Sequence, residues 1–197
     1  LLLEEELAPK TVRDILVVVR SVLDYTAKRF PATFPTVHID YPKESKKEMR
    51  VLNREEQARF SRFLLQDMDA CKFGVLLALL TGIRIGELCA LQWENISLQE
   101  NTIRICSTMQ RLRDMNGEQE SRTRIVIGSP KSDTSARTIP ISRTVAALCR
   151  RMDPQMPAAF VLTGTSRYME PRTLQYRMER YTESCGLDGV HFHTLRH

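Results

Sequence analysis

The stretch that decides the fold lies near the middle of the chain, where an apolar run ends in a glycine, an arginine and a glutamate. It reads Leu79-Leu80-Thr81-Gly82-Ile83-Arg84-Ile85-Gly86-Glu87-Leu88. The run over 71–80 predicts a buried helix that stops near Gly82, and a second helix is expected over about 85–93. Arg84 then lies at a helix junction close to the core, where Glu87 can orient its guanidinium. Taken alone, the segment fits a structural ion pair better than a catalytic group.

The remaining periodicities predict an α+β fold that is mostly helical and contains a small antiparallel sheet. Further helices are expected where apolar residues recur at helical spacing or a capping residue precedes them, over 9–30, 53–64, 142–152 and 171–185. Strands are expected in short β-branched runs, over 102–105, 124–127, 138–141 and 160–162. Residues 131–135 lie between two of these strands, so we expect them at a hairpin tip.

A proline-rich, charged segment divides the chain in two. Residues 31–50 contain three prolines and a run of six residues of which five are charged, as a linker would. We therefore expect one domain to end, together with its linker, within residues 1–45, and a second domain to occupy 46–197.

Composition places the chain among folded globular proteins. Its 197 residues are 42% hydrophobic and 27% charged, which excludes wholesale disorder. No apolar run approaches the length needed to cross a bilayer, and the first residues lack the features of a signal peptide, so we expect no membrane partner. The five cysteines are far apart and form no CxxC pair, which argues against a disulfide framework and predicts a reducing, cytoplasmic location.

The basic residues are unevenly distributed. The net charge is only +5, but residues 101–151 hold ten basic and four acidic side chains, as a surface for a polyanion requires. A solvated face explains the same excess equally well. After Lys72 come fifteen arginines and a single lysine, Lys131. Because lysine can give up its proton and arginine cannot, Lys131 is a candidate for proton transfer.

Histidines gather at the end of the sequence, which reads His191-Phe192-His193-Thr194-Leu195-Arg196-His197. His193 and Arg196 are three residues apart and would be neighbours on a helix, where they join a titratable imidazole to a phosphate-binding fork. The spacing of His193 and His197 also suits zinc, with His191 as a possible companion. The positive charge of Arg196 and the lack of a nearby carboxylate or cysteine ligand argue against a metal.

Three segments together resemble the tyrosine recombinases, the family of phage and conjugative-transposon integrases. The segment over 79–88, with Trp93 and Ile96, looks like the family's first arginine box. The segment Pro130-Lys131-Ser132-Asp133-Thr134-Ser135-Ala136-Arg137-Thr138-Ile139-Pro140 resembles the β-hairpin that carries its lysine, and 193–197 resembles its His-x-x-Arg box. The order and spacing agree over about residues 50–197. The resemblance implies that 46–197 is a catalytic domain and that 1–45 is the end of a helical core-binding domain.

The resemblance also implies a chemistry. A tyrosine cleaves one DNA strand and becomes linked to its 3′ phosphate, so that neither a metal nor another cofactor is needed. Arg84 and Arg196 would stabilise the charge of the transition state, Lys131 would protonate the leaving 5′ oxygen, and His193 would assist the tyrosine or bind a phosphate oxygen. Glu87 and His197 would support these four. The implied partner is double-stranded DNA, on which the full-length protein would form a homotetramer. The implied location is the bacterial cytoplasm, in association with the nucleoid.

One expected residue has no match in the sequence. The family's nucleophile follows the His-x-x-Arg box, whereas all five tyrosines here precede His193. Because no tyrosine follows His193 and no methionine precedes Met49, we expect a recombinase fragment that is cut at both ends, with a catalytic domain incomplete at its C-terminus. The alternative is a non-catalytic DNA-binding or regulatory fragment of the same fold. In either case the candidate phosphate contacts are basic residues of the catalytic domain, namely Arg104, Arg111, Arg113, Arg122, Arg124, Arg137, Arg172 and Arg177.

Overall fold

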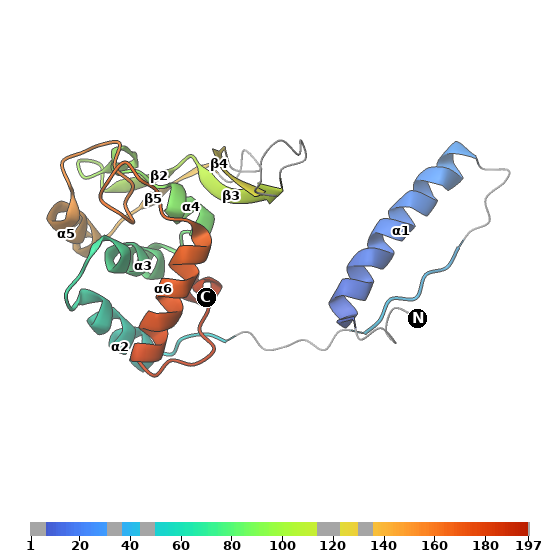
Figure 1. Cartoon of the computed structure of the whole chain (residues 1–197), viewed down its shortest axis with the longest axis horizontal. Coiled ribbons are helices and arrows are strands. Elements are labelled where there is room, and N and C mark those ends of the chain that lie inside the picture. The colour runs from blue at the N-terminus through green and yellow to red at the C-terminus, as the bar shows by residue number, and fades with distance from the viewer. Residues whose placement is uncertain (1–6, 31–36, 44–49, 114–122, 130–135, 197) are drawn as a thin grey trace. The chain divides into compact units, whose positions relative to one another are not determined.

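The computed structural model describes residues 7–30, 37–43, 50–113, 123–129 and 136–196. The chain divides into two compact units, residues 1–48 and 49–197 (Figure 1), which are described separately. In the first unit the predicted helix is confirmed as α1, Pro9–Arg29. It begins with a proline in its first turn, where the missing N–H costs nothing.

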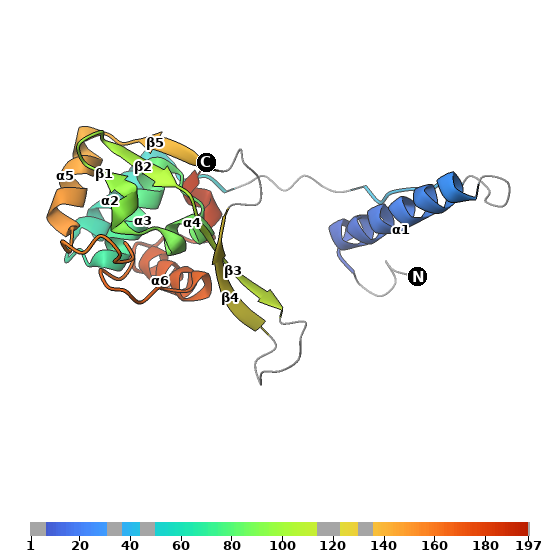
Figure 2. The same ribbon diagram turned by 90° about the horizontal axis from the view of Figure 1, so that it is seen from above.

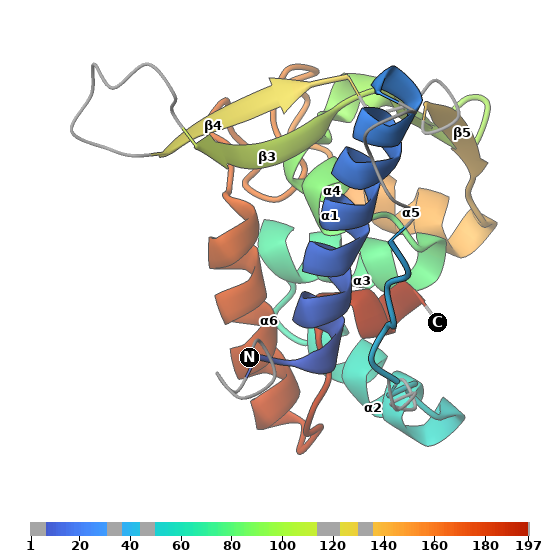
Figure 3. The ribbon, with the colours of Figure 1, turned by 90° about the vertical axis from the view of Figure 1, so that its right-hand side faces the viewer.

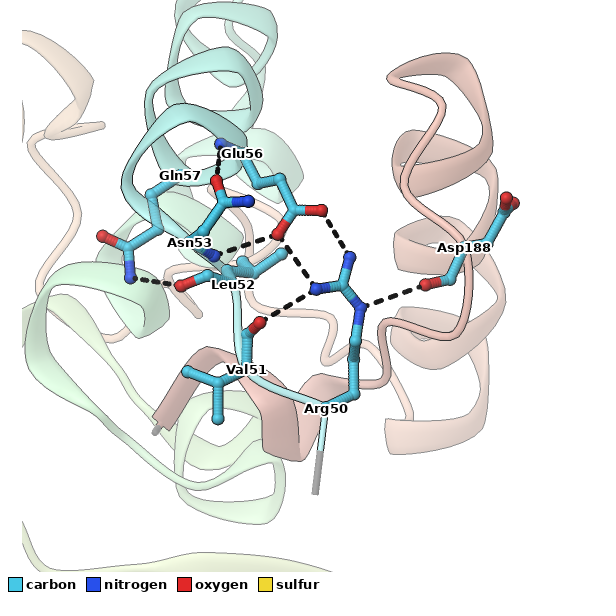
Figure 4. A network of polar contacts seen from close by, with 7 residues as sticks. All are labelled: Arg50, Val51, Leu52, Asn53, Glu56, Gln57 and Asp188. Atoms are coloured by element: carbon cyan, nitrogen blue, oxygen red, sulfur yellow. Dashed lines mark hydrogen bonds and ion pairs between the residues drawn. The ribbon is translucent and has the colours of Figure 1, made fainter. Parts of the chain in front are cut away.

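Local capping signals set where the first helices of the second unit begin and end. These helices are α2 (Arg54–Leu65), α3 (Ala70–Thr81) and α4 (Ile85–Ala90). The predicted capping box is confirmed, because Asn53 Oδ1 accepts the N–H of Glu56 and Glu56 accepts that of Asn53, each at 2.9 Å. Figure 4 shows how Arg50 closes this network by donating to both carboxylate oxygens of Glu56 and to the backbone oxygens of Val51 and Asp188.

α3 ends where the sequence predicts, whereas α4 is shorter than expected. Gly82 follows α3 with φ of +68°, the left-handed conformation that favours glycine. α4 stops at Ala90 because Leu91 is extended, and a short 3₁₀ helix, η1 (Trp93–Asn95), follows. The NH of Trp93 donates to the oxygen of Ala159 and that of Val161 to Leu91, so tertiary contacts replace the last predicted turn.

The remaining helices follow the predicted pattern. They are α5 (Arg143–Met152), α6 (Pro171–Ser184) and the 3₁₀ helix η3 (Phe192–Arg196). Ser142 caps α5 by accepting the N–H of Val145 at 3.3 Å, as predicted. The strand expected over 160–162 is wrong: Phe160 forms only isolated bridges, to Gln92 and Thr165.

Two small antiparallel sheets stand where one was expected. The first contains β1 (Ile96–Ser97), β2 (Thr102–Ile105) and β5 (Arg137–Pro140) in that order, and the second pairs β3 (Thr108–Arg113) with β4 (Thr123–Gly128). The α+β class is confirmed. The expected hairpin of residues 124–127 with 138–141 is wrong, because β3, which the sequence did not reveal, pairs with all six residues of β4. The expected tip, 131–135, lies outside the described residues.

The core of the second unit is built around α3, whose residues from Phe73 to Ala78 are all buried. α2 and α5 pack against α3, and α6 packs against α2 and α4. The β3–β4 hairpin extends from this body, as Figures 2 and 3 show. The hairpin is held against α4 by an unusually close approach at Gly86. A Cβ added there would lie 2.7 Å from Thr108 Oγ1 and 2.8 Å from the backbone oxygen of Met109. Glycine at this position therefore lets β3 reach α4.

Candidate active site

Arg84 is held at the N-terminus of α4 by the fold of the junction before it. The buried side chain of Ile83 anchors the junction, and Gly82 turns the chain out of α3. Arg84 is the N-cap of α4 and keeps its side chain 48% exposed, so it is fixed at its base and open at its tip. Arg196 lies next to the same junction, because a Cβ added to Gly82 would be 3.7 Å from Cγ of Arg196.

Glu87 lies under Arg84 and binds two arginines at once. Its Oε1 accepts from Nη1 of Arg84 and from Nη1 of Arg137, each at 2.9 Å. Its Oε2 accepts from Nη2 of Arg137 at 2.8 Å and from the backbone N–H of Arg84 at 3.0 Å. The carboxylate is only 3% exposed, so these four bonds supply the partners that water would otherwise provide.

The protonation of Glu87 follows from this arrangement. Burial alone would raise the pKa of its carboxyl group, but hydrogen bonds from Arg137 and Arg84 outweigh burial and lower the pKa to about 2. Glu87 therefore stays ionised at neutral pH. Two guanidiniums share one carboxylate, which leaves one positive charge in excess at the junction.

A cavity of about 590 Å³ opens beside this cluster. Its lining comes from the N-terminal turn of α4, the β3–β4 hairpin, the start of α6 and η3. Among the lining residues are three arginines and a histidine, namely Arg84, Arg111, Arg172 and His193. Glu170 contributes the negative charge and forms an ion pair with Arg111. Positive side chains from three separate elements thus converge on one hollow, an arrangement that suits an anionic group such as a phosphate.

The C-terminal box reaches the cavity because η3 is anchored in the core. Phe192, Thr194 and Leu195 are buried, whereas His193 and Arg196 are exposed. Residues three apart eclipse on a 3₁₀ helix, so His193 and Arg196 lie on the same side. η3 packs against α3, which places Arg196 beside Gly82 and His193 in the lining of the cavity.

The other candidate residues are dispersed. Lys131, Arg122 and His197 lie outside the described residues. Arg113 and Arg124 are exposed on the hairpin, and Arg104 donates to Oδ1 of Asn95 at 3.3 Å. Arg177 lines a different hollow, together with Arg180 on the same helix.

Two contacts of the site were missed by the sequence reasoning. Arg137 had been assigned to DNA, but its guanidinium binds Glu87, and Glu170 had not been singled out at all. Nothing local marks either contact, since Arg137 meets Glu87 across 50 positions and Arg111 meets Glu170 across 59. Only the charge balance offered a signal, because a buried glutamate within an arginine-rich region needs a cationic partner.

The described residues offer no alternative centre for a metal. Within the ranges given above, no three His, Cys, Asp or Glu side chains lie close enough together to hold an ion. Among the helices of the same ranges, none is both long and apolar enough to span a membrane.

Two integrases resemble the chain in sequence. The chain is 22% identical to the ICEBs1 integrase of Bacillus subtilis (strain 168) over 212 residues, which cover 100% of this chain and 54% of the relative. It is 28% identical to the integrase of Staphylococcus phage L54a over 172 residues, or 80% of this chain and 49% of that one. The chain therefore spans about half the length of the curated relatives it matches.

Solved structures share the fold. The Tn1549 transposon integrase, in complex with transposon right end DNA, matches 100% of this chain and 67% of its own with a TM-score of 0.73 at 17% identity. A lambda integrase tetramer bound to a Holliday junction matches 91% of this chain and 51% of its own with a TM-score of 0.51 at 17% identity. The sequence model of the phage integrase family matches residues 50–197. Because that match covers most of the sequence, the chain belongs to the phage integrase family of tyrosine recombinases.

Proposed function

We propose that residues 46–197 form a catalytic domain that contains the phosphate-binding part of the active site of a site-specific DNA recombinase, which integrates or excises a mobile element. The observation that carries the proposal is the convergence of Arg84 and His193 on one cavity, with Arg196 beside the same junction. Membership of the family and the fold shared with integrases agree with it. We assign residues 1–45 to the end of a helical core-binding domain and its linker.

In the proposed chemistry, positive side chains lie where negative charge develops on the phosphate during the reaction. Attack on a DNA phosphate increases the negative charge on its non-bridging oxygens, and fixed guanidiniums stabilise that state more than the ground state. Arg84 and Arg196 take this role. His193 either accepts the proton of the attacking tyrosine or donates to a phosphate oxygen, and Lys131 protonates the leaving 5′ oxygen. The resulting 3′-phosphotyrosyl link conserves the bond energy, so rejoining requires neither a nucleotide nor a metal.

The three tyrosines of the second unit do not lie in the cavity lining. Tyr181 of α6 packs against the hydrophobic core, with its ring centroid 5.9 Å from that of Phe63, and burial raises the pKa of its hydroxyl above the ordinary value. Tyr168 and Tyr176 are exposed but, like Tyr181, are not among the residues that line the cavity. The proposed chemistry therefore needs a tyrosine other than these three.

DNA is the proposed partner, bound as a duplex recombination site by a homotetramer. Arg111 and Arg172 line the cavity and Arg113 and Arg124 project from the hairpin, where each can contact a phosphate. Such contacts position a duplex without reading its sequence. Binding should weaken with salt, with a log–log slope of about −0.9 for each phosphate neutralised. An affinity that does not change between low and moderate salt would contradict this electrostatic interpretation.

The test uses the protein made from the whole reading frame that encodes these residues and a nicked suicide duplex of its recombination site. Covalent protein–DNA complex should accumulate with the parent protein and form at least about 10²-fold more slowly with Arg84→Ala. Arg62→Gln is the matched control, because Arg62 is exposed at the end of α2 and has no part in the proposed site. If Arg84→Ala trapped DNA as fast as the parent, the assignment would be wrong.

The second candidate function is a non-catalytic DNA-binding or regulatory protein of the same fold. The observation that favours it is that Tyr168, Tyr176 and Tyr181 of the second unit are not among the residues that line the cavity. This candidate predicts salt-sensitive binding to duplex DNA with no covalent complex, even from the whole reading frame. The suicide-duplex experiment therefore separates the two functions directly.

A further inference from the structure

Arg137 is the residue of the site whose position is least expected from the sequence. It opens β5, where it pairs with Ile105 of β2, and its side chain reaches across to α4. Its two terminal nitrogens donate to the two oxygens of Glu87 at 2.9 and 2.8 Å, the bidentate geometry of a strong arginine–carboxylate pair. Arg84, in contrast, gives the same carboxylate a single side-chain hydrogen bond, from Nη1.

We propose that Arg137 is a positioning residue, which occupies Glu87 so that Arg84 is held by one hydrogen bond and presents the rest of its guanidinium to the phosphate cavity. The inference rests on the proposed function, because it concerns the arginine assigned to the scissile phosphate. Exposure follows the same division of roles. Glu87 is 3% exposed, the side chain of Arg137 is 28% exposed and that of Arg84 is 48% exposed. Arg84 is among the described residues that line the cavity, and Arg137 is not.

The geometry of the carboxylate gives the reason. An ionised carboxylate accepts about four hydrogen bonds, and Glu87 receives four, two of them from Arg137. Removal of Arg137 would free one site on each oxygen. The guanidinium of Arg84 could then form a bidentate pair with Glu87, since two parallel hydrogen bonds are more favourable than one. A closed pair turns away from the cavity, and the Arg84–Glu87 pair then offers a phosphate no net positive charge.

This role differs from the one that the sequence suggested, a direct contact between Arg137 and DNA. A phosphate contact acts independently of Arg84 and contributes to the salt dependence of binding. A positioning residue acts only through Arg84, so it contributes nothing to that slope once Arg84 has been replaced. The two roles therefore make opposite predictions for the same variants.

The first measurement is a double-mutant cycle on the rate of covalent complex formation by the protein from the whole reading frame. Arg137→Gln should lower the rate by up to about 10²-fold, the usual cost of displacing a catalytic group by about 1 Å. Arg137→Lys should recover only part of the rate, because an ammonium cannot form the fork. In an Arg84→Lys background, Arg137→Gln should have little further effect. Equal losses in both backgrounds would overturn the proposal, and so would an undiminished rate in Arg137→Gln itself.

The second measurement is the salt dependence of duplex binding. In an Arg84→Gln background, Arg137→Gln should leave the log–log slope unchanged, whereas loss of a direct phosphate contact by Arg137 would reduce it by about 0.9. A reduction of that size would replace the positioning role by a DNA contact. Arg62→Gln serves as the control for the loss of one exposed positive charge.

The third measurement separates this inference from the proposed function. If the parent protein binds duplex DNA but forms no covalent complex, the proposed recombinase activity fails, and a crystal structure of the Arg137→Gln variant still decides the role of Arg137. We expect Arg84 bidentate on Glu87 in that variant, turned away from the cavity. An Arg84 that keeps its single bond to Glu87 and its place in the cavity would overturn the inference. A thermal melt confirms beforehand that the variant is folded.

Discussion

Two helices of this chain begin with the same device, but only one of them serves the site. At the start of α2 the glutamate in the third position, Glu56, accepts the N–H of the N-cap residue Asn53 and the fork of Arg50. At the start of α4, Glu87 does the same for the N-cap residue Arg84 and the fork of Arg137. The pKa of each glutamate is lowered to about 2, for Glu56 mainly by its hydrogen bond to Arg50.

The difference lies in the N-cap residue. The side-chain oxygen of Asn53 accepts the N–H of Glu56, which completes the capping box, so this side chain has only a structural role. Arginine has no acceptor, so Arg84 cannot close the box and its guanidinium remains available to the cavity. The comparison teaches that a capping position can be used for function when a buried neighbour takes over the stabilising role. Each of the following experiments tests that difference.

Acid should have the largest effect, because it removes both boxes at once. The folded-state pKa of Glu87 and of Glu56 is about 2, below the unfolded value of about 4.3. Their contribution to stability is therefore complete above that unfolded value and is lost as the pH falls from about 4.5 towards 2. Urea unfolding of the parent protein at a series of pH values between about 4.5 and 2 measures this loss of stability. If the boxes do not contribute, Glu87→Gln and Glu56→Gln variants would lose stability over this interval as steeply as the parent.

Glu87→Gln should have the next largest effect. It removes the buried counter-charge of two partly exposed guanidiniums, and we expect the free energy of unfolding at neutral pH to fall by about 2–3 kcal/mol. Glu56→Gln is the matched variant in α2 and should lose less, because Glu56 is more exposed. An equal loss in both variants would remove the distinction between the two boxes.

Gly86→Ala tests the packing that places α4 against the hairpin. The new methyl group would lie 2.8 Å from the backbone oxygen of Met109, so we expect a loss of about 1–3 kcal/mol in denaturant unfolding. The equivalent position in α2 is Glu55, which is exposed, and Glu55→Ala should change stability by less than about 0.5 kcal/mol. A Gly86→Ala variant as stable as the parent would show that β3 moves away easily.

Asn53→Ala should have the smallest effect, since it removes half of one box. We expect a loss of about 1 kcal/mol, and Asn53→Asp should preserve the cap. At the matching position Arg84→Ala removes no cap and should leave the free energy of unfolding within about 0.5 kcal/mol of the parent, although it should slow the proposed DNA cleavage. Thermal or urea unfolding compares the three variants. If Arg84→Ala cost as much stability as Asn53→Ala, Arg84 would be a structural residue.

The sequence by itself determined the features that depend on neighbours along the chain. The Asn53 box, the end of α3 at Gly82, the Ser142 cap and the pairing of Arg84 with Glu87 all join residues at most four positions apart, and all were predicted. Local geometry suffices for them because a helix terminus offers the same unpaired groups in every protein.

Only the tertiary structure decided which distant residues meet. The pairing of β3 with β4 and the fork of Arg137 on Glu87 join segments that are far apart in sequence, and no local pattern indicated either. The grouping of His193 with Arg84 was expected only from the family resemblance, and in the structure both line the cavity. Several pairings of such segments satisfy the same local patterns, as the mistaken hairpin of β4 with β5 illustrates. The choice among them depends on the packing of α3, α4 and η3 in one core, which selects the arrangement that pairs the buried carboxylate and fills the space around Gly86.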